Sequence, residues 1–271
     1  MKLFPCAKIN LGLYVTERRA DGYHNLETVF YPIPLCDELE VELAERDALS
    51  LHGISVEGTA ADNLVVKAVR LLRDAGFPVP PLHIRLTKRI PSGAGLGGGS
   101  SDAAHTMLAV RDLCHLSLDN LQIQQMLSHL GADCPFFVKS RPVLATGIGD
   151  QFTSIGLSLR GLWLLLVKPD DFVSTREAYS RVRPRQPQHD LSKSIMRPIE
   201  EWRDLIANDF EESVFPLHPT IAHIKQRLYD AGAAYAAMSG SGGSVFGIFR
   251  SQPEPELLHS FAPHFVFSSQ L

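Results

Sequence analysis

The chain has 271 residues, of which 45% are hydrophobic and 21% charged, and a net charge of −4. This composition is ordinary for a globular protein of one large or two average domains. The acidic balance argues against a nucleic-acid partner, because backbone binding needs a basic face. The longest apolar run, 162–167, is far too short to span a bilayer, and the N-terminus lacks an apolar signal-peptide core. We therefore expect no nucleic-acid or membrane partner and a cytoplasmic location.

The four cysteines show no C-x-x-C spacing. They are Cys6, Cys36, Cys114 and Cys134. Scattered cysteines of this kind are typical of free thiols in a reducing compartment, and they indicate neither a disulfide framework nor a zinc site.

The hydrophobic pattern of the first half predicts both strands and helices. In chain order we expect a strand over 7–15, a strand over 39–43, a helix capped by Asp62 and running to Ala75, a strand over 82–86, helices over 102–114 and 118–130, and a strand with a turn over 143–149.

The second half continues the mixture. We expect a strand over 162–167, a helix over 175–182 capped by Ser174, a surface loop over 184–198, helices over 199–207 and 220–231, and strands over 233–238 and 244–249. Strands and helices without strict alternation favour an α+β fold in two lobes. We place the lobes at residues 1–157 and 158–271.

The most informative segment is the glycine-rich run 91–104, between the strand expected over 82–86 and the helix that follows. Glycine lets the backbone approach a ligand closely and adopt positive φ. The free N–H groups and the positive end of a helix then attract an anion. The segment indicates a phosphate-binding loop, and the alternative is a plain flexible connector.

Two well-known phosphate sites do not fit this loop. Gly93, Gly95 and Gly98 match the G-x-G-x-x-G spacing of dinucleotide-binding folds, but no strand ending in an acidic residue follows them. A Walker A loop ends in Gly-Lys-Ser/Thr, whereas this loop ends in Gly99-Ser100-Ser101 and contains no lysine. The cation for the phosphates must come from another segment or from a metal ion.

Lys8 and Asp133 are candidate catalytic residues because each carries a charge in an apolar segment. Lys8 lies in the first expected strand and is either an exposed lysine at the sheet edge or a functional cation. Asn10, two residues further, lies on the same face of the strand. Asp133 is surrounded by small and aromatic residues, where a carboxylate is costly unless it is paired. It is a helix cap or turn residue, or a functional group. A lysine facing Asp133 would keep it ionised and ready to accept a proton from a substrate hydroxyl.

Further candidates for substrate contact lie in three segments. Tyr23 and His24 place an aromatic face beside an imidazole, which suits a planar base; otherwise they are a loop tyrosine and a solvated histidine. Thr175 and Tyr179 are four residues apart and share a helix face, as a substrate wall or as core packing. The run 239–244 holds more glycine than a two-residue hairpin needs, so it is a hairpin turn or a second close approach to a ligand.

Taken together, these segments resemble the GHMP kinase superfamily. The resemblance rests on residues 5–11, on the glycine loop 91–104 and on residues 239–244, and it extends over nearly the whole chain. Residues 19–24 and 131–137 are similar to those of one branch of the superfamily. Its members phosphorylate a cytidine diphosphate derivative of methylerythritol in the non-mevalonate pathway of isoprenoid synthesis.

The resemblance implies a fold and a reaction. The N-terminal lobe would be like ribosomal protein S5 domain 2 and would bind ATP, and a ferredoxin-like C-terminal lobe would complete the substrate cleft. The reaction would transfer the γ-phosphoryl group of ATP to the 2-hydroxyl of the methylerythritol moiety.

The resemblance also implies roles for individual residues. Asp133 would be the catalytic base and Lys8 the cation beside it. Asn10 and Thr175 would hold the methylerythritol part, Tyr23 and Tyr179 would enclose the cytosine, and His24 would read its edge. The ATP-binding residues would be Pro91, Gly93, Ala94, Gly95, Leu96, Gly97, Gly98, Gly99, Ser100 and Ser101. The third segment would contribute Gly240, Ser241 and Gly242 to substrate binding.

ATP and Mg²⁺ are the implied cofactors, and Mg²⁺ should bridge the phosphates and keep several waters. Ser100 and Ser101 are candidates to touch the ion, but the helix glutamate of several superfamily members has no obvious counterpart, so the metal ligands stay open. We expect a small-molecule substrate and a monomer or weak homodimer.

Three alternative functions are disfavoured by particular features of the chain. A kinase of mevalonate or homoserine has no use for the base-reading pair Tyr23 and His24. An RNA- or ligand-binding module would need neither Lys8 nor Asp133, and the net charge is acidic. A dinucleotide oxidoreductase does not fit the position of the glycine loop.

Overall fold

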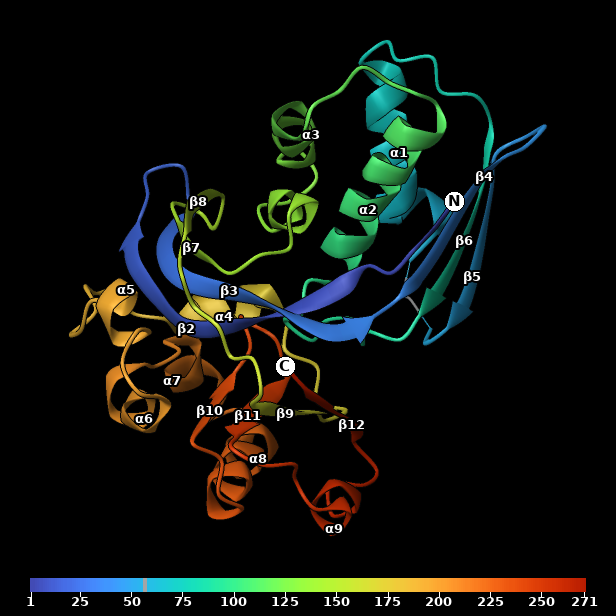
Figure 1. Ribbon diagram of the computed structural model, residues 1–271. Coiled ribbons are helices and arrows are strands. Elements are labelled where there is room, and N and C mark those ends of the chain that lie inside the picture. The colour runs from blue at the N-terminus through green and yellow to red at the C-terminus, as the bar shows by residue number, and fades with distance from the viewer. Residues whose placement is uncertain (56–57) are drawn as a thin grey trace. The chain divides into compact units, whose positions relative to one another are not determined.

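The computed structural model describes residues 1–55 and 58–271 as two compact units (Figure 1), each assembled from separate parts of the chain. The first unit contains residues 1–8, 35–92 and 97–141, and the second contains residues 9–34, 93–96 and 142–271. The lobe boundary at residues 157 and 158 stays a prediction. Among the described residues, no helix has both the length and the apolar character that a membrane crossing requires.

The strands are β1 (Lys2–Leu3), β2 (Cys6–Arg18), β3 (His24–Cys36), β4 (Glu38–Leu43), β5 (Ala48–Gly53), β6 (Leu82–Lys88), β7 (Val143–Thr146), β8 (Gln151–Ser154), β9 (Trp163–Lys168), β10 (Tyr235–Met238), β11 (Val245–Phe249) and β12 (Phe265–Gln270). The α-helices are α1 (Leu64–Asp74), α2 (Gly98–Leu113), α3 (Asn120–Leu127), α4 (Thr175–Arg181), α5 (Leu191–Ser194), α6 (Trp202–Leu205), α7 (Phe210–Val214), α8 (Pro219–Asp230) and α9 (Pro255–His259). Short 3₁₀ helices are η1 (Ala60–Asp62), η2 (Cys134–Val138) and η3 (Ile199–Glu201).

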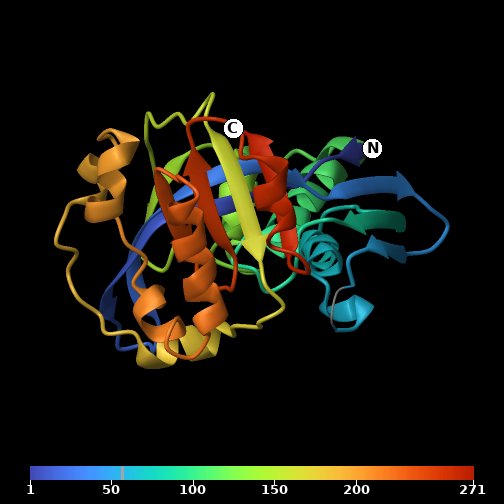
Figure 2. The ribbon, with the colours of Figure 1, turned by 90° about the horizontal axis from the view of Figure 1, so that it is seen from below.

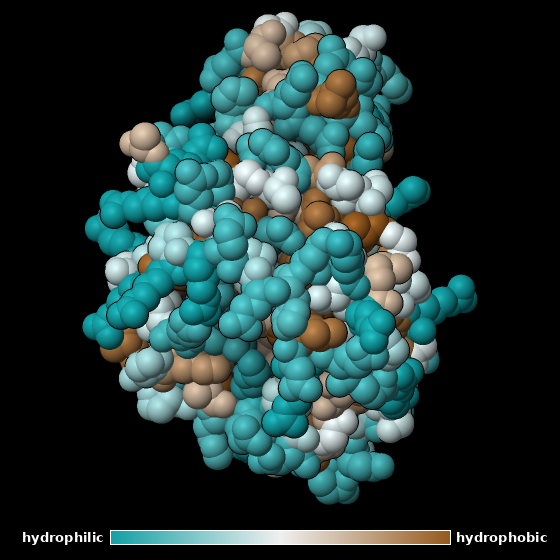
Figure 3. Space-filling model, turned by 90° about the vertical axis from the view of Figure 1, so that its left-hand side faces the viewer, coloured by the Kyte–Doolittle hydropathy of each residue, from teal (hydrophilic) through white to brown (hydrophobic). Residues whose placement is uncertain are grey.

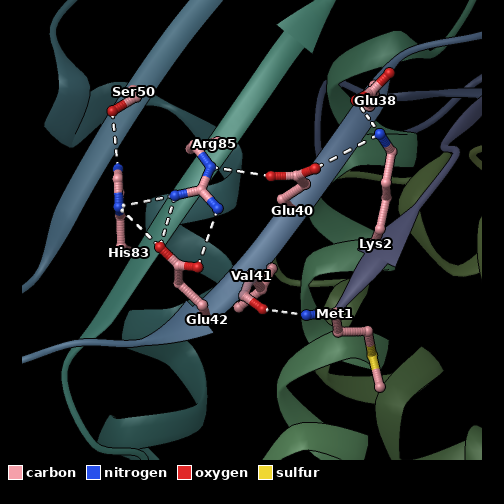
Figure 4. A network of polar contacts seen from close by, with 9 residues as sticks. All are labelled: Met1, Lys2, Glu38, Glu40, Val41, Glu42, Ser50, His83 and Arg85. Carbon is pink, nitrogen blue, oxygen red and sulfur yellow. Dashed lines mark hydrogen bonds and ion pairs between the residues drawn. The ribbon is translucent and has the colours of Figure 1, made fainter.

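The first unit is built on a four-stranded sheet in the order β1-β4-β6-β5, in which only β5 runs parallel to its neighbour. The alternation of β6 buries Leu82, Ile84 and Leu86, while His83 and Arg85 lie on the other face. Helix α2 packs on β4 and α1 packs on α2 (Figure 1). The outer face carries a network of ion pairs in which Arg85 contacts Glu40 and Glu42 (Figure 4). One face of the sheet therefore supports the helices and the other is charged.

The second unit holds two further sheets, in the orders β2-β3-β7-β8 and β10-β11-β9-β12. In the latter sheet every pairing is antiparallel, and α8 lies across β10 and β11 (Figure 2). The apolar faces of α8 and of this sheet meet in one core. The core includes Leu165, Val167, Ile221, Ile224, Leu228, Met238 and Val245. The sequence places an apolar residue at every position from Leu162 to Val167, as expected for a strand buried on both faces.

The α+β fold class is confirmed, and several expected boundaries are corrected. The N-cap of α1 is Asn63, whose side chain accepts a hydrogen bond from the Val65 N–H; Asp62 instead bonds to Thr59 in the preceding turn. Helix α2 begins at Gly98, inside the glycine run, rather than at Asp102. Residues 191–194, expected as loop, form α5, and the helix expected over 199–207 is divided into η3 and α6.

The face drawn in Figure 3 is mostly hydrophilic, and its apolar residues form small separate groups. Scattered apolar residues are normal on a protein surface and do not indicate a docking site.

Candidate active site

Lys8 and Asp133 form an ion pair in the first unit, with Lys8 Nζ 3.4 Å from Asp133 Oδ2. The Lys8 side chain is 3% exposed, so the alternative of an exposed edge lysine is wrong. Asp133 lies at the start of η2, but within the described chain its side chain makes no capping hydrogen bond there. It is 34% exposed. The pair therefore combines a buried cation with a carboxylate that remains open to a ligand.

The second half of the glycine loop belongs to the same unit and begins α2. Gly97 is the N-cap of α2 and has a φ of +69°. A Cβ atom at Gly97 would lie 2.7 Å from Phe137 Cζ and 3.3 Å from Lys8 Cε. Only glycine fits where the start of the helix passes this closely over Lys8 and η2. The first turn of α2, with its free N–H groups, thus lies next to the ion pair, in a position suited to an anion.

The first half of the glycine loop is in the second unit and packs against the turn 239–243. Gly95 has a φ of +75°, and a Cβ atom there would lie 2.0 Å from the carbonyl oxygen of Ser239. The Ser239 hydroxyl donates a hydrogen bond of 3.0 Å to the Gly95 carbonyl. The amide of Asn208 holds the turn from the other side by donating to the carbonyls of Met238 and Gly240.

The turn between β10 and β11 therefore makes its close approach to the glycine loop. Gly242 is part of the same contact, since a Cβ atom there would lie 2.3 Å from the Gly95 nitrogen. The sequence pointed to a hairpin turn or to a ligand contact, and it gave no sign of this packing between two backbones or of the role of Asn208.

Asn10 and Thr175 both lie next to this turn. Asn10 is 2% exposed, and its amide donates to the Thr28 hydroxyl at 2.9 Å. Its Oδ1 faces Gly240, where a Cβ atom would come within 3.2 Å. Thr175 is exposed at the start of α4, and its Oγ1 accepts from the Ser241 hydroxyl at 3.5 Å. The structure thus gathers four of the sequence-predicted substrate residues, Asn10, Thr175, Gly240 and Ser241, around one turn.

Of the three side chains expected to contact a base, His24 and Tyr179 lie together. The rings of His24 and Tyr179 are 5.0 Å apart, and Phe210 supports Tyr179 edge-on at 4.7 Å. Burial lowers the pKa of His24, and the charge of Arg18 lowers it further. A neutral imidazole can donate from one nitrogen and accept at the other, as reading a base edge requires. Tyr23 is 62% exposed, so its ring surface is available to a ligand.

A buried lysine between two aspartates was missed by the sequence analysis. Lys88 Nζ contacts Asp37 and lies 2.6 Å from Asp102 Oδ2, and all three residues are nearly inaccessible to solvent. Burial raises the pKa of Asp102 to about 7; the attraction of Lys88 opposes this shift and the charge of Asp37 adds to it. Two carboxylates thus share one cation in the interior of the first unit.

This group borders a cavity of about 210 Å³ in the first unit. Its lining includes Asn63, Leu64, Lys88, Ser92, Gly99 and Asp102. Asp102 Oδ1 is buried and has no hydrogen-bond partner among residues 1–55 and 58–271. The one signal in the sequence is the position of Asp102, a single carboxylate between two serines and two alanines.

Two family models match the chain. The GHMP kinases N terminal domain model matches residues 63–141, and the GHMP kinases C terminal model matches residues 191–265. The first match contains the glycine loop and Asp133, and the second contains the turn 239–243.

Curated relatives match over the full length. The chain is 49% identical over 271 residues to the 4-diphosphocytidyl-2-C-methyl-D-erythritol kinase of Parabacteroides distasonis, covering 100% of both chains. It is 50% identical over 276 residues to the protein of the same name from Bacteroides fragilis, again with 100% of both covered.

Solved structures agree with these relatives. A crystal structure of 4-(cytidine 5'-diphospho)-2C-methyl-D-erythritol kinase superposes with a TM-score of 0.80 at 32% identity, covering 100% of both chains. The mevalonate kinase of Methanococcus jannaschii has a TM-score of 0.74 at 17% identity over 100% of this chain and 98% of its own, which shows a shared fold alone. The chain therefore belongs to the GHMP kinase family, in the branch of the 4-diphosphocytidyl-2-C-methyl-D-erythritol kinases.

Proposed function

We propose that this protein transfers the γ-phosphoryl group of ATP to the 2-hydroxyl of 4-diphosphocytidyl-2-C-methyl-D-erythritol, the compound in the names of its relatives. The observation that carries the proposal is the Lys8–Asp133 ion pair next to the first turn of α2. A base, a cation and an anion site within one unit are the parts that phosphoryl transfer requires, because this reaction depends mainly on positioning and on stabilisation of charge.

Asp133 is the proposed catalytic base. Its carboxylate lies beside the Lys8 ammonium and would accept the proton of the substrate hydroxyl as that oxygen attacks phosphorus. The Lys8 side chain is buried. Its positive charge would therefore stay beside the reacting oxygen during the transfer. A fixed charge of this kind stabilises the transition state without reorganisation.

ATP would bind along the glycine loop, Pro91 to Ser101. Its phosphates would accept hydrogen bonds from the N–H groups at the start of α2. We assign the nucleoside part to the cavity bordered by Ser92 and Gly99. Asn63 lines the same cavity, and its side-chain amide would supply a donor.

Mg²⁺ is proposed as the cation of the bound nucleotide, and the residues present fit it. This ion keeps several waters and takes most of its other ligands from phosphates, so a protein cage is not needed. Within the described residues there is no group of three or more His, Cys, Asp or Glu side chains able to hold a metal. Ser100 is partly exposed at the start of α2, whereas Ser101 is buried against His105, so Ser100 is the one that would hold the ion. When bound, the ion would neutralise charge on the phosphates.

The cytidine part would bind in the second unit. Tyr23 and Tyr179 would enclose the cytosine, His24 would read its edge, and Asn10 and Thr175 would hold the methylerythritol part with Gly240, Ser241 and Gly242 of the turn. The protein would act on this small molecule in the cytoplasm as a monomer or weak homodimer, without a nucleic-acid or membrane partner.

The test is ADP release from Mg-ATP with the cytidine compound, mevalonate, homoserine or no acceptor. We expect turnover with the cytidine compound alone. In Asp133→Asn, kcat should fall at least about 100-fold while ATP affinity changes little, since a general base contributes about 10²–10⁴. Asp112→Asn, on the exposed end of α2, is the matched control.

If kcat of Asp133→Asn were unaltered, Asp133 would be excluded as the catalytic base. Turnover with another alcohol would overturn the substrate assignment, and no turnover from a folded protein that binds ATP would overturn the proposed function.

A further inference from the structure

Two of the four cysteines are brought together by the pairing of strands in the first unit. The register of β1 with β4 places Lys2 opposite Glu40 and Leu3 opposite Leu39. The hydrogen bond of 2.9 Å from the Asp37 N–H to the Pro5 carbonyl continues that register. One residue further, it places Cys6, at the start of β2, directly opposite Cys36, at the end of β3.

The hydrogen-bond pattern also fixes which kind of pair the two cysteines form. Met1 and Val41 exchange both of their backbone hydrogen bonds, as seen in part in Figure 4. In antiparallel strands such pairs alternate with non-hydrogen-bonded pairs, so Pro5–Asp37 is of the first kind and Cys6–Cys36 of the second. Non-hydrogen-bonded pairs have Cα atoms about 4.5 Å apart and side chains in direct contact. That separation lies within the range of about 4.4–6.8 Å that a disulfide spans.

The two thiols already interact and differ in chemistry. Both cysteines are partly exposed, so small reagents reach them. A hydrogen bond from the Cys36 thiol lowers the pKa of Cys6 to about 7; burial opposes this shift, and a hydrogen bond from Ser140 adds to it. The pKa of Cys36 is raised by the same hydrogen bond and by burial. Cys6 is therefore the thiolate of the pair, and Cys36 keeps its proton.

We propose that Cys6 and Cys36 form a peroxide-sensitive dithiol, which closes to a cross-strand disulfide within the folded chain. The Cys6 sulfur attacks one oxygen of hydrogen peroxide, and the O–O bond breaks to give Cys6 sulfenic acid and water. The Cys36 sulfur then attacks the Cys6 sulfur, the S–S bond forms, and the hydroxyl leaves with the Cys36 proton as a second water. The peroxide gains two electrons and the two thiols lose them. A small dithiol restores the two thiols by exchange and is itself oxidised to a disulfide.

The other two cysteines provide internal controls. Cys134 is buried, and burial raises its pKa to about 11. Burial also raises the pKa of Cys114, which lies at the end of α2. Neither shares the register that joins Cys6 to Cys36, so neither should enter the disulfide.

The experiment treats the reduced, full-length protein with hydrogen peroxide, alkylates the remaining thiols, and maps the peptides by mass spectrometry. We expect two of the four cysteines to escape alkylation, joined as one Cys6–Cys36 peptide pair, with an unchanged circular dichroism spectrum and full recovery after dithiothreitol. Cys114→Ser should form the same disulfide. Cys36→Ser should stop at a sulfenic acid on Cys6, which dimedone traps.

Alkylation of both Cys6 and Cys36 after peroxide treatment would overturn the proposal. A disulfide that involves Cys114 or Cys134, or that links two molecules, would overturn it as well. These readouts are made on the unmodified sequence, so they do not depend on whether a variant folds or on whether the protein is the kinase proposed above.

Discussion

Asp102→Asn tests the buried charge balance of the first unit. Lys88 faces both Asp37 and Asp102, so the group carries one negative charge in excess when both carboxylates are ionised. Burial lowers the pKa of Lys88, but the two aspartates outweigh this effect and hold it above its ordinary value, so the lysine stays charged through neutral pH. The replacement by asparagine keeps the size of the side chain and leaves Lys88 paired one-to-one with Asp37.

The magnitude follows from the pKa of Asp102, which is about 7 in the folded protein and about 3.9 when unfolded. Because the folded value is the higher one, the folded state binds the extra proton between these values. Stability contributed by this proton is fully present below the unfolded pKa and is lost as the pH rises through 7. At about 1.4 kcal/mol per unit, the loss between pH 5 and pH 8 is about 3 kcal/mol.

The assay is urea unfolding of both proteins at pH 5 and pH 8, followed by circular dichroism. Between pH 5 and pH 8, the unfolding free energy of Asp102→Asn should fall by about 3 kcal/mol less than that of the unmodified protein. Asp112→Asn is the control, because Asp112 lies on the same helix and its side chain is 49% exposed. Its unfolding free energy should follow the pH dependence of the unmodified protein.

Equal pH dependence in the Asp102→Asn variant and the unmodified protein would refute the reasoning. It would mean that Asp102 is already ionised at pH 5 and that the excess charge is balanced by a group outside the Lys88 cluster. A greater loss in the variant would mean that ionised Asp102 stabilises the fold through Lys88, and the sign of the argument would be wrong.

The remaining predictions concern a cap, a loop and an aromatic ring. Asn63→Ala should lower the unfolding free energy by about 1 kcal/mol, because α1 loses the side-chain bond to the Val65 N–H; an unchanged urea midpoint would contradict the cap. Gly97→Ala should lower kcat of a protein that still folds, because the added methyl group presses on Phe137 and Lys8; ADP release at saturating substrates measures it. Tyr23→Ala should raise KM for the cytidine compound about 10-fold, since base stacking is worth about 1–3 kcal/mol, and an unchanged KM would remove the stacking role.

Sequence patterns predicted the elements that carry a clear hydrophobic period or run and missed those that depend on distant partners. Strand β6 was foreseen because its apolar residues alternate, and α8 because its apolar stripe has helical spacing. Strand β3 was not expected: it contains two prolines, and its pairing with β7 joins residues more than 100 positions apart. Strand β5 was also not expected; its side chains are mostly exposed, and it is held by parallel pairing with β6.

The same division applies to the candidate site. Lys8 and Asp133 stood out because each is a charge in an apolar segment, and their pairing was anticipated from the cost of burying a carboxylate alone. Lys88 and Asp37 gave no such signal, since Lys88 is the polar last residue of β6, Asp37 lies between β3 and β4, and both are buried only in the folded unit. The contact of Gly95 with the Ser239 carbonyl was also not predicted, because the glycines indicate a close approach but not which segment makes it.

The two glycines Gly95 and Gly97 should differ in how their loss can be repaired. A methyl group at Gly97 would meet the side chains of Phe137 and Lys8, and a smaller residue at position 137 makes room for it. A methyl group at Gly95 would meet the carbonyl oxygen of Ser239, which every amino acid at position 239 carries. A selection for revertants should therefore yield second-site suppressors of Gly97→Ala, whereas Gly95→Ala should return only by restoring the glycine codon.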